Sequence, residues 1–220
     1  MKKRVFLNQA LLTPVVVKVV AGLAAASPLS ALSQRVLQPG RNYRKLASPR
    51  RTHADVGKIE VIEFFWVGCP HCRAIDPTIL QWEKQMPADV IFRKVHVNFR
   101  VPTHQRLYYT LETLKLADAM TPAVFAEIHD RRNRLQTDQL VFDWAERQGI
   151  ERASFMETYK SFGVSTRMKR ASQQVSEYAV DGVPTLAVNG KYVTSPSMAG
   201  SNASAMQVVD ALISLEREKA

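Results

Sequence analysis

The 220-residue sequence predicts an α/β fold in which helices flank a mixed central sheet and a helical subdomain is inserted into it. Three observations predict this class. A β-rich segment at 58–67 is followed by a helical segment and then by a second β-rich segment at 90–99. A long stretch of helical periodicity occupies 101–165. A hairpin signal and a last helical stripe follow, so the first three elements predict a βαβ unit and the last ones complete the sheet.

The first 33 residues predict a secretory signal peptide. They contain four basic residues and no Asp or Glu, and an apolar stretch, Val19–Ala26, leads from Lys18 into small residues. Cleavage after Ala26 or near Ser33 would fit this pattern. The alternative is an N-terminal membrane anchor, but eight apolar residues after Lys18 are too few to span a bilayer. The pattern therefore favours an exported protein.

The charge of the chain gives little support to a nucleic-acid partner. The formal net charge is +10, and without residues 1–33 the chain holds 26 basic and 20 acidic residues, a net +6. We find no run of Lys and Arg interleaved with aromatic residues and no nucleic-acid motif. A moderate positive balance serves solubility or attracts acidic surfaces.

The segments around the first strand follow from local signals. Residues 34–57 are polar and basic and predict an extended lead-in with room for one short strand. The segment 58–67 (KIEVIEFFWV) predicts a buried strand that ends at Gly68. A helix then opens at Cys69, because the following proline occupies a first-turn position where a missing N–H costs nothing. Pro77 predicts a kink in that helix.

The second half of the chain alternates helical and strand signals. Gly149 predicts a helix stop within the inserted block, and 166–178 predicts a further helix. Asn189-Gly190 between two short apolar runs is a strong hairpin signal, and 203–218 carries a helical stripe. The predicted organisation is a signal peptide at 1–33, the first part of the sheet domain at 34–100, the inserted helical subdomain at 101–165 and the second part of the sheet domain at 166–220.

The only two cysteines, Cys69 and Cys72, are separated by two residues. A disulfide between them closes a very small loop, so it constrains the unfolded chain little. Exported proteins that use disulfides for stability usually join distant segments. The spacing therefore favours chemistry over structural cross-linking.

A strand that leads directly into a CxxC pair at a helix start is typical of a redox site. Free N–H groups and the helix dipole stabilise a thiolate on Cys69, and a protonated His71 would add positive charge. Cys72 lies one turn deeper, which predicts that Cys69 reacts with substrate and that Cys72 resolves the mixed disulfide. A stabilised thiolate favours the reduced form, so the pair is expected to donate its disulfide.

Three segments resemble the DsbA family of periplasmic thiol–disulfide interchange proteins: EFFWVGCPHC, HVNF and GVPTLAVNGKY. The resemblance covers most of 58–220. It implies a thioredoxin fold with an inserted helical subdomain, and a monomer that donates disulfides to unfolded exported proteins in the periplasm. It implies no cofactor beyond the Cys69–Cys72 disulfide, with Pro70 and His71 as part of the redox centre. It also implies reoxidation by a quinone-linked membrane oxidase like DsbB.

The resemblance further implies that Val183-Pro184 is a cis peptide bond facing Cys69. The backbone of Val183 would then pair with an extended substrate chain. From the residues alone, Pro184 also fits an ordinary trans turn.

Glu63 lies inside the apolar strand and has two interpretations. It faces solvent at a sheet edge, or it is a buried acid that takes up the proton of Cys72. The resemblance supports the second and implies that Lys94 accompanies it, since a paired charge is less costly to bury. A solvated strand lysine is the alternative for Lys94.

The remaining candidates rest on single residues. Trp66 lines the substrate groove or packs within the strand, and Met198 lies in a loop (TSPSMAGSN) that resembles one beside the family's apolar groove. His96 is a site residue or a packed core histidine. The histidines expected to face solvent are His53, His104 and His129.

Three other functions fit parts of the pattern. A disulfide isomerase or reductase could use the same fold, although residues 34–57 are too few for the dimerisation domain that such isomerases carry. A metal-binding module is disfavoured because no second CxxC or HxxxH exists. A chaperone-like peptide-binding module would not need Cys69.

Overall fold

The computed structural model describes residues 37–219, so the predicted signal peptide lies outside the described residues. Five strands are present in the described part: β1 (Arg44–Lys45), β2 (Ile59–Phe65), β3 (Val90–His96), β4 (Thr185–Val188) and β5 (Tyr192–Thr194). The helices are α2 (Pro70–Glu83), α3 (Pro102–Thr113), α4 (Ala117–His129), α5 (Asp138–Arg147), α6 (Arg152–Lys160), α7 (Phe162–Glu177), α8 (Pro196–Ala199) and α9 (Asn202–Arg217).

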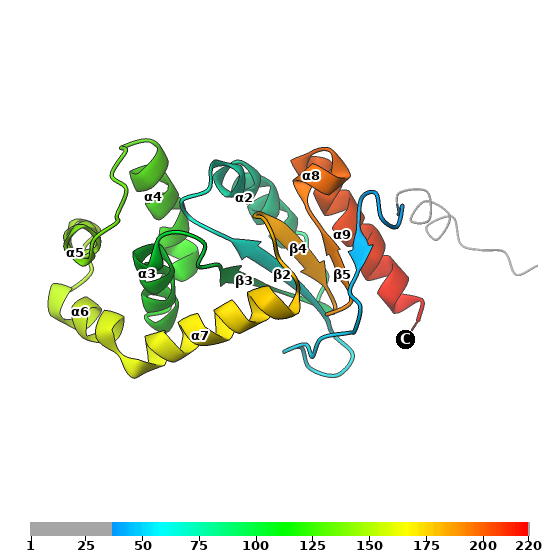
Figure 1. The fold of residues 1–220 in the computed structure, drawn as a ribbon, viewed down its shortest axis with the longest axis horizontal. Coiled ribbons are helices and arrows are strands. Elements are labelled where there is room, and N and C mark those ends of the chain that lie inside the picture. The colour runs from blue at the N-terminus through cyan, green and yellow to red at the C-terminus, as the bar shows by residue number, and fades with distance from the viewer. Residues whose placement is uncertain (1–36, 220) are drawn as a thin grey trace, which may run out of the picture.

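The strands form one mixed sheet in the order β1-β5-β4-β2-β3 (Figure 1). β2 and β3 are parallel and are joined through α2, whereas β4 pairs antiparallel with both β2 and β5. All seven residues of β2 are buried, as expected of a strand covered on both faces. The mixed sheet predicted from the sequence is confirmed.

Two neighbouring residues of β2 belong to different cores. Val61 belongs to a cluster formed with α2 and α9, which includes Ile75 and Leu212. Ile62 belongs to a larger cluster that joins the other face of the sheet to the helices from α3 to α7. Figure 1 shows these helices on one side of the molecule and α9 on the other. The inserted helical subdomain is therefore packed against the sheet, beside the helix that carries the cysteines.

Most element predictions are confirmed within a few residues. The hairpin turn at Asn189-Gly190 has positive φ at both residues, as a type I′ turn requires. Gly149 has a φ of +79° and follows α5, as the helix-stop prediction required. The strand expected over 90–99 ends earlier, at His96. A single helix, α7, runs through the expected boundary between 165 and 166.

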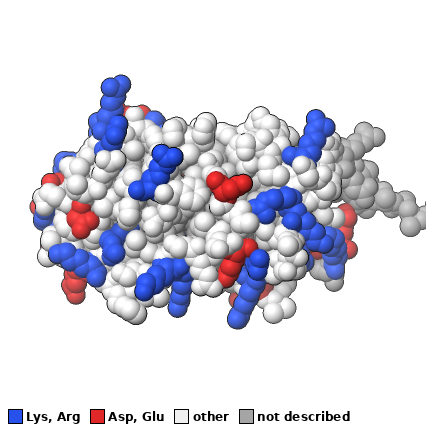
Figure 2. Space-filling view, viewed as in Figure 1, with Lys and Arg blue, Asp and Glu red and all other residues white. Residues whose placement is uncertain are grey.

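The lead-in is fixed to the fold through β1 and through the Arg50 N–H, which donates to the Gly190 carbonyl oxygen at 2.7 Å. Arg44 in β1 pairs with β5, and its guanidinium donates to the carbonyl oxygens of Tyr178 and Ala179 at 2.7 and 2.8 Å. Figure 2 shows Lys and Arg side chains over α7 and along this lead-in. Among residues 37–219, no helix is long and apolar enough to cross a membrane.

Candidate active site

Cys69 lies at the N-cap of α2, just after the turn that ends β2. Its side chain does not cap the helix, and Pro70 begins the first turn. The turn is closed by the Cys69 N–H, which donates to the Trp66 carbonyl oxygen at 2.9 Å. The first backbone N–H groups of α2 therefore remain available to a group at the position of the Cys69 sulfur.

The pKa of the Cys69 thiol is lowered to about 6. The hydrogen bond from the Cys72 thiol is the largest cause, burial opposes it, and the backbone N–H groups of Cys72 and His71 follow. The charge of His71 contributes least of the named causes, and this side chain is exposed. The structure thus agrees with the predicted lowering of the Cys69 pKa, but the Cys72 thiol contributes more to it than the charge of His71 does.

Cys72 has the opposite environment. It is 0% exposed, against 8% for Cys69, and both thiols are free. Burial raises the pKa of Cys72 far above its ordinary value, and its hydrogen bond with Cys69 and the charge of Glu63 add to this. Cys69 is therefore the cysteine that ionises, and Cys72 holds its proton.

The Val183-Pro184 bond is cis, which confirms the expectation from the resemblance. The Cys69 thiol donates to the Val183 carbonyl oxygen at 3.5 Å, so this bond faces the reactive sulfur. A pocket of about 480 Å³, here called the cis-proline pocket, lies between this loop and α2. It is lined by residues that include His71, Val183, Pro184 and Ser195.

Met198 does not line the cis-proline pocket. The sequence places it in a loop, but it lies half-buried in the short helix α8. Ser195 caps this helix by accepting a hydrogen bond from the Met198 N–H at 3.2 Å. The loop prediction for this segment was therefore wrong.

Glu63 is buried in β2 with an exposed fraction of 1%, so the solvent-facing interpretation was wrong. Lys94 Nζ lies 3.5 Å from Glu63 Oε2 and 2.6 Å from Asp76 Oδ1. Burial raises the pKa of Glu63 to about 7, although Lys94 pulls it down. The carboxyl can therefore exchange a proton near neutral pH.

Asp76 was missed in the sequence analysis. It lies on the buried side of α2, one turn after Cys72, and the 2.6 Å contact makes it the nearer partner of Lys94. An acidic residue at a buried position of an apolar helix stripe is the signal that could have identified it.

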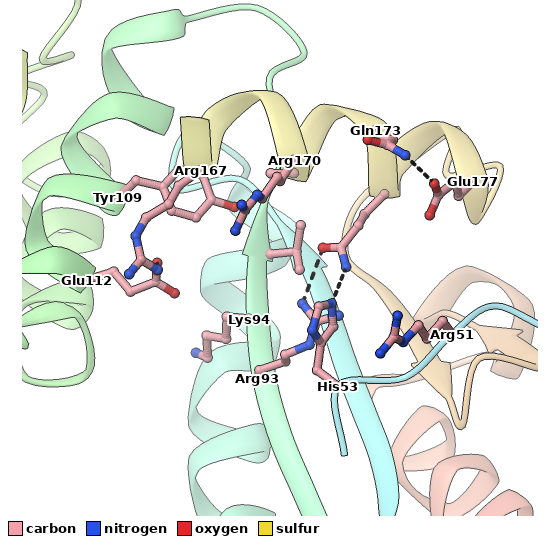
Figure 3. Close-up of a pocket in the computed structure, with 13 residues that line it drawn as sticks. Arg51, His53, Arg93, Lys94, Tyr109, Glu112, Arg167, Arg170, Gln173 and Glu177 are labelled. Carbon is pink, nitrogen blue, oxygen red and sulfur yellow. Dashed lines mark hydrogen bonds and ion pairs between the residues drawn. The ribbon is translucent and has the colours of Figure 1, made fainter. Parts of the chain in front are cut away.

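Lys94 also borders a second, solvent-open pocket of about 500 Å³ at the edge of the sheet (Figure 3). Figure 3 shows Lys94 and Arg93 on β3, with Arg167 and Arg170 of α7 across the pocket and Glu112 on α3. Arg167 pairs with Glu112 at 2.8 Å. Lys94 thus connects the buried Glu63 to a pocket that is open to solvent.

The histidines divide into three cases. His96 is fully buried, its pKa is lowered to about 3 by burial, and it accepts from the Val67 N–H at 3.2 Å, so it is a core histidine. His53 is exposed, as predicted. His104 and His129 were expected in solvent, and this was wrong.

His104 is buried at 2% exposure. The Trp66 indole N–H donates to His104 Nδ1 at 2.9 Å, and His104 Nε2 lies 2.6 Å from the Arg134 carbonyl oxygen. His129 is half-buried, with Nε2 2.9 Å from the Val67 carbonyl oxygen. No spacing rule in the sequence predicted these contacts, because they join segments far apart along the chain.

A metal centre finds no support among residues 37–219, where no group of three or more His, Cys, Asp or Glu side chains could hold an ion. The two cysteines instead face each other across one helical turn. The arrangement of one ionised and one protonated thiol, with a titrating carboxyl nearby, suits thiol–disulfide exchange.

Comparison with known proteins gives one consistent result. The family model described as "DSBA-like thioredoxin domain" matches residues 79–212. The thiol:disulfide interchange protein DsbA of Burkholderia cepacia is 39% identical over 202 residues, which cover 90% of this chain and 92% of the relative. The DsbA of Pseudomonas aeruginosa is 37% identical over 183 residues, covering 82% and 86%. The crystal structure of Pseudomonas aeruginosa DsbA matches with a TM-score of 0.80 and 36% identity, covering 83% of this chain and 96% of that one.

Proposed function

The chain belongs to the DSBA-like thioredoxin domain family and is a thiol–disulfide oxidoreductase, and on this premise we propose that the Cys69–Cys72 pair donates its disulfide to newly exported proteins. The observation that carries the proposal is the contrast between the two thiols. The pKa of Cys69 is lowered to about 6, whereas burial raises that of Cys72. A sulfur that is stable as an anion makes the reduced state favourable, so the disulfide accepts electrons readily.

The exchange begins on the oxidised pair. A substrate thiolate attacks Sγ of Cys69, a substrate–Cys69 bond forms, and the Cys69–Cys72 bond breaks. The electron pair goes to the Cys72 sulfur, which takes a proton because its pKa is raised by burial. Glu63 supplies this proton, since its pKa of about 7 leaves it partly protonated, and Lys94 holds it in place.

A second substrate thiolate then attacks the substrate sulfur of the mixed disulfide. The substrate disulfide forms and Cys69 leaves as a stabilised thiolate, so two electrons pass from the substrate to the pair. The cis Val183-Pro184 bond supports a role in binding, because it places a backbone carbonyl at the reactive sulfur for an extended chain to pair with.

The proposal also covers location and partners. The protein acts as a monomer in the periplasm after removal of the signal peptide. A quinone-linked membrane oxidase like DsbB takes up the two electrons and restores the disulfide. No cofactor besides the cysteine pair takes part.

A trapping experiment tests the proposal. Oxidised wild-type protein should oxidise a reduced two-cysteine peptide. Cys72→Ser protein, first activated as a mixed disulfide, should hold a peptide with a single cysteine on Cys69, because this peptide has no second thiol to release it. Cys69→Ser protein is the matched control and should trap nothing. Equilibration with glutathione decides the direction: a pair that stays oxidised where a cytosolic reductant is already reduced would show that the protein is not a disulfide donor.

A further inference from the structure

A further pocket lies beside Cys69 and shares no lining residue with the cis-proline pocket. It has a volume of about 440 Å³. We call it the insertion-side pocket. Its lining includes Trp66, Gly68 and Pro70, which are near the reactive cysteine in the chain, together with Arg100, His104 and Arg134. Because Gly68 and Pro70 flank Cys69 in the chain, a group bound here lies close to the reacting sulfur.

The lining of this pocket holds two arginines and no carboxylate. Arg100 and Arg134 are exposed, and neither side chain forms an ion pair with any residue of 37–219. Neighbouring arginines differ: Arg131 in the same turn pairs with Glu127 at 3.0 Å. In the pocket of Figure 3, Arg167 is likewise paired, with Glu112. The insertion-side pocket therefore carries positive charge that is not neutralised locally.

His104 links the Trp66 ring to the backbone of Arg134. Its Nδ1 accepts the Trp66 indole N–H, so the ring proton lies on Nε2 and is donated to the Arg134 carbonyl oxygen at 2.6 Å. Thr103 Oγ1 also donates to the Leu135 carbonyl oxygen at 2.9 Å. The backbone that carries Arg134 is therefore bonded to α3, and the Trp66 ring is fixed beside it.

The half-buried lining residues of the pocket, here called its floor, include the apolar side chains of Trp66, Val101 and Ile128, whereas both arginines are exposed. Such a surface suits the methylene groups of a side chain whose charged end lies at the rim. A free inorganic anion would gain nothing from this apolar floor. The combination of an apolar floor with cationic rim residues fits the side chain of Glu or Asp.

We propose that the insertion-side pocket is a substrate subsite that accepts an acidic side chain next to the reacting cysteine. This inference rests on the proposed function and adds a preference among substrates. A substrate chain that pairs with the Val183 backbone passes over Cys69, and residues near Cys69 in the chain line both pockets: His71 lines the cis-proline pocket, and Gly68 and Pro70 line the insertion-side pocket. Arg100 and Arg134 then attract a carboxylate that precedes or follows the substrate cysteine.

The test uses three reduced peptides with blocked ends that differ only at one position next to a cysteine, which carries Glu, Gln or Lys. Each rate of oxidation by the oxidised protein is divided by the rate with a small-molecule disulfide, because a nearby charge alters the reactivity of the peptide thiol itself. We expect the Glu peptide to react about two to five times faster than the Gln peptide, as for an exposed ion pair. The preference should shrink as ionic strength rises.

Variants test whether Arg100 and Arg134 cause the preference for the Glu peptide. The double variant Arg100→Gln/Arg134→Gln should react equally with the Glu and Gln peptides, and Arg100→Glu/Arg134→Glu should favour the Lys peptide. Lys169→Gln/Arg170→Gln is the matched control: both residues are exposed on α7 and lie outside the insertion-side pocket, and their loss removes the same two positive charges. This control should retain the wild-type preference.

The outcomes separate this inference from the proposed function. If wild-type protein oxidises all three peptides at the same normalised rate, the subsite is wrong while the oxidase function stands. A preference for the Glu peptide that survives in Arg100→Gln/Arg134→Gln also shows that the proposed subsite is wrong. If no peptide is oxidised, the proposed function itself fails.

Discussion

At the scale of single residues, the site depends on which groups donate to the Cys69 sulfur. The sequence suggested the helix N-terminus and His71, because both are visible in the CPHC motif. The structure adds the thiol of Cys72 as the largest cause of the lowered pKa. Contributions from a thiol that is buried one turn deeper depend on packing, and the sequence does not report packing.

The order of these causes can be tested by titrating the reduced protein. Thiolate absorbance of the wild type should rise with a midpoint near pH 6, from Cys69 alone. Cys72→Ala removes the first cause and should raise the midpoint by about one unit or more. His71→Ala should raise it less, because its charge is the last of the named causes. Cys69→Ser should abolish the signal, and a larger shift in His71→Ala than in Cys72→Ala would contradict the order.

Glu63 makes the stability of the protein depend on pH in an unusual direction. Its pKa is raised from 4.5 to about 7 in the folded state by burial. Between these two values the folded state binds more protons than the unfolded state, so the free energy of unfolding falls as pH rises. Above about pH 7 the loss is complete.

Glu63→Gln removes this titration. In the reduced state, the free energy of unfolding of the variant relative to wild type should increase from pH 4.5 to about 7 and then level off. The total increase is on the order of 3 kcal/mol for a fully buried group with this shift. Denaturant unfolding across this range measures the difference. A difference that is independent of pH would show that Glu63 is ionised alike in both states.

At the scale of elements, local signals predicted most of the fold. The run from β2 through Cys69 into α2 and the Asn189-Gly190 turn each rest on a few adjacent residues, and both are confirmed. The helix α8 was missed because it has only four residues, although Ser195 and the following proline are its start signals. The start of α7 was placed too late, since the exposed Phe162 and the adjacent glycine obscure its apolar pattern.

A substitution at Gly190 tests how the turn between β4 and β5 contributes to stability. Gly190 has a φ of +63°, and a Cβ there would lie 2.2 Å from the backbone oxygen of Arg50 in the lead-in. Gly190→Ala should therefore lower the free energy of unfolding by about 2 kcal/mol or more, from steric conflict and backbone strain. Gly163→Ala in α7 is the control, because a Cβ there meets only Ser161 Oγ, at 3.7 Å. It should leave stability unchanged or raise it by up to about 1 kcal/mol; equal losses in both variants would contradict the explanation.

At the scale of the whole molecule, the inserted subdomain is attached to the edge of the sheet through β3. The N–H of His96 donates to the Tyr109 hydroxyl at 3.2 Å, and its carbonyl oxygen accepts from Gln105 Nε2 at 2.9 Å. Both partners come from α3, and all three residues are buried. The sequence predicted the insertion but not this junction, nor the bonds of His104 and His129, because contacts between distant segments leave no local pattern.

The contact between β3 and α3 predicts that removing the hydroxyl group has different effects on stability at two buried tyrosines. Tyr109→Phe leaves the His96 N–H without its partner, so it should lower the free energy of unfolding by about 1 to 3 kcal/mol. The Tyr178 hydroxyl is also buried but has no hydrogen-bond partner among residues 37–219. Tyr178→Phe removes only an unpaired polar group, so it should leave stability unchanged or raise it.

Hydrogen exchange shows where that stability is lost. If α3 docks through β3, amides of α3 to α6 should exchange faster in Tyr109→Phe, while those of α9, which packs on the other face of the sheet, keep their wild-type protection. Uniformly faster exchange would mean that insertion and sheet unfold as one unit. Unchanged exchange in α3 would show that the Tyr109 hydroxyl does not hold the subdomain to the sheet. Because the insertion-side pocket is built from α3, α4 and the turn bonded to His104, loosening this junction should also weaken the preference for acidic peptides.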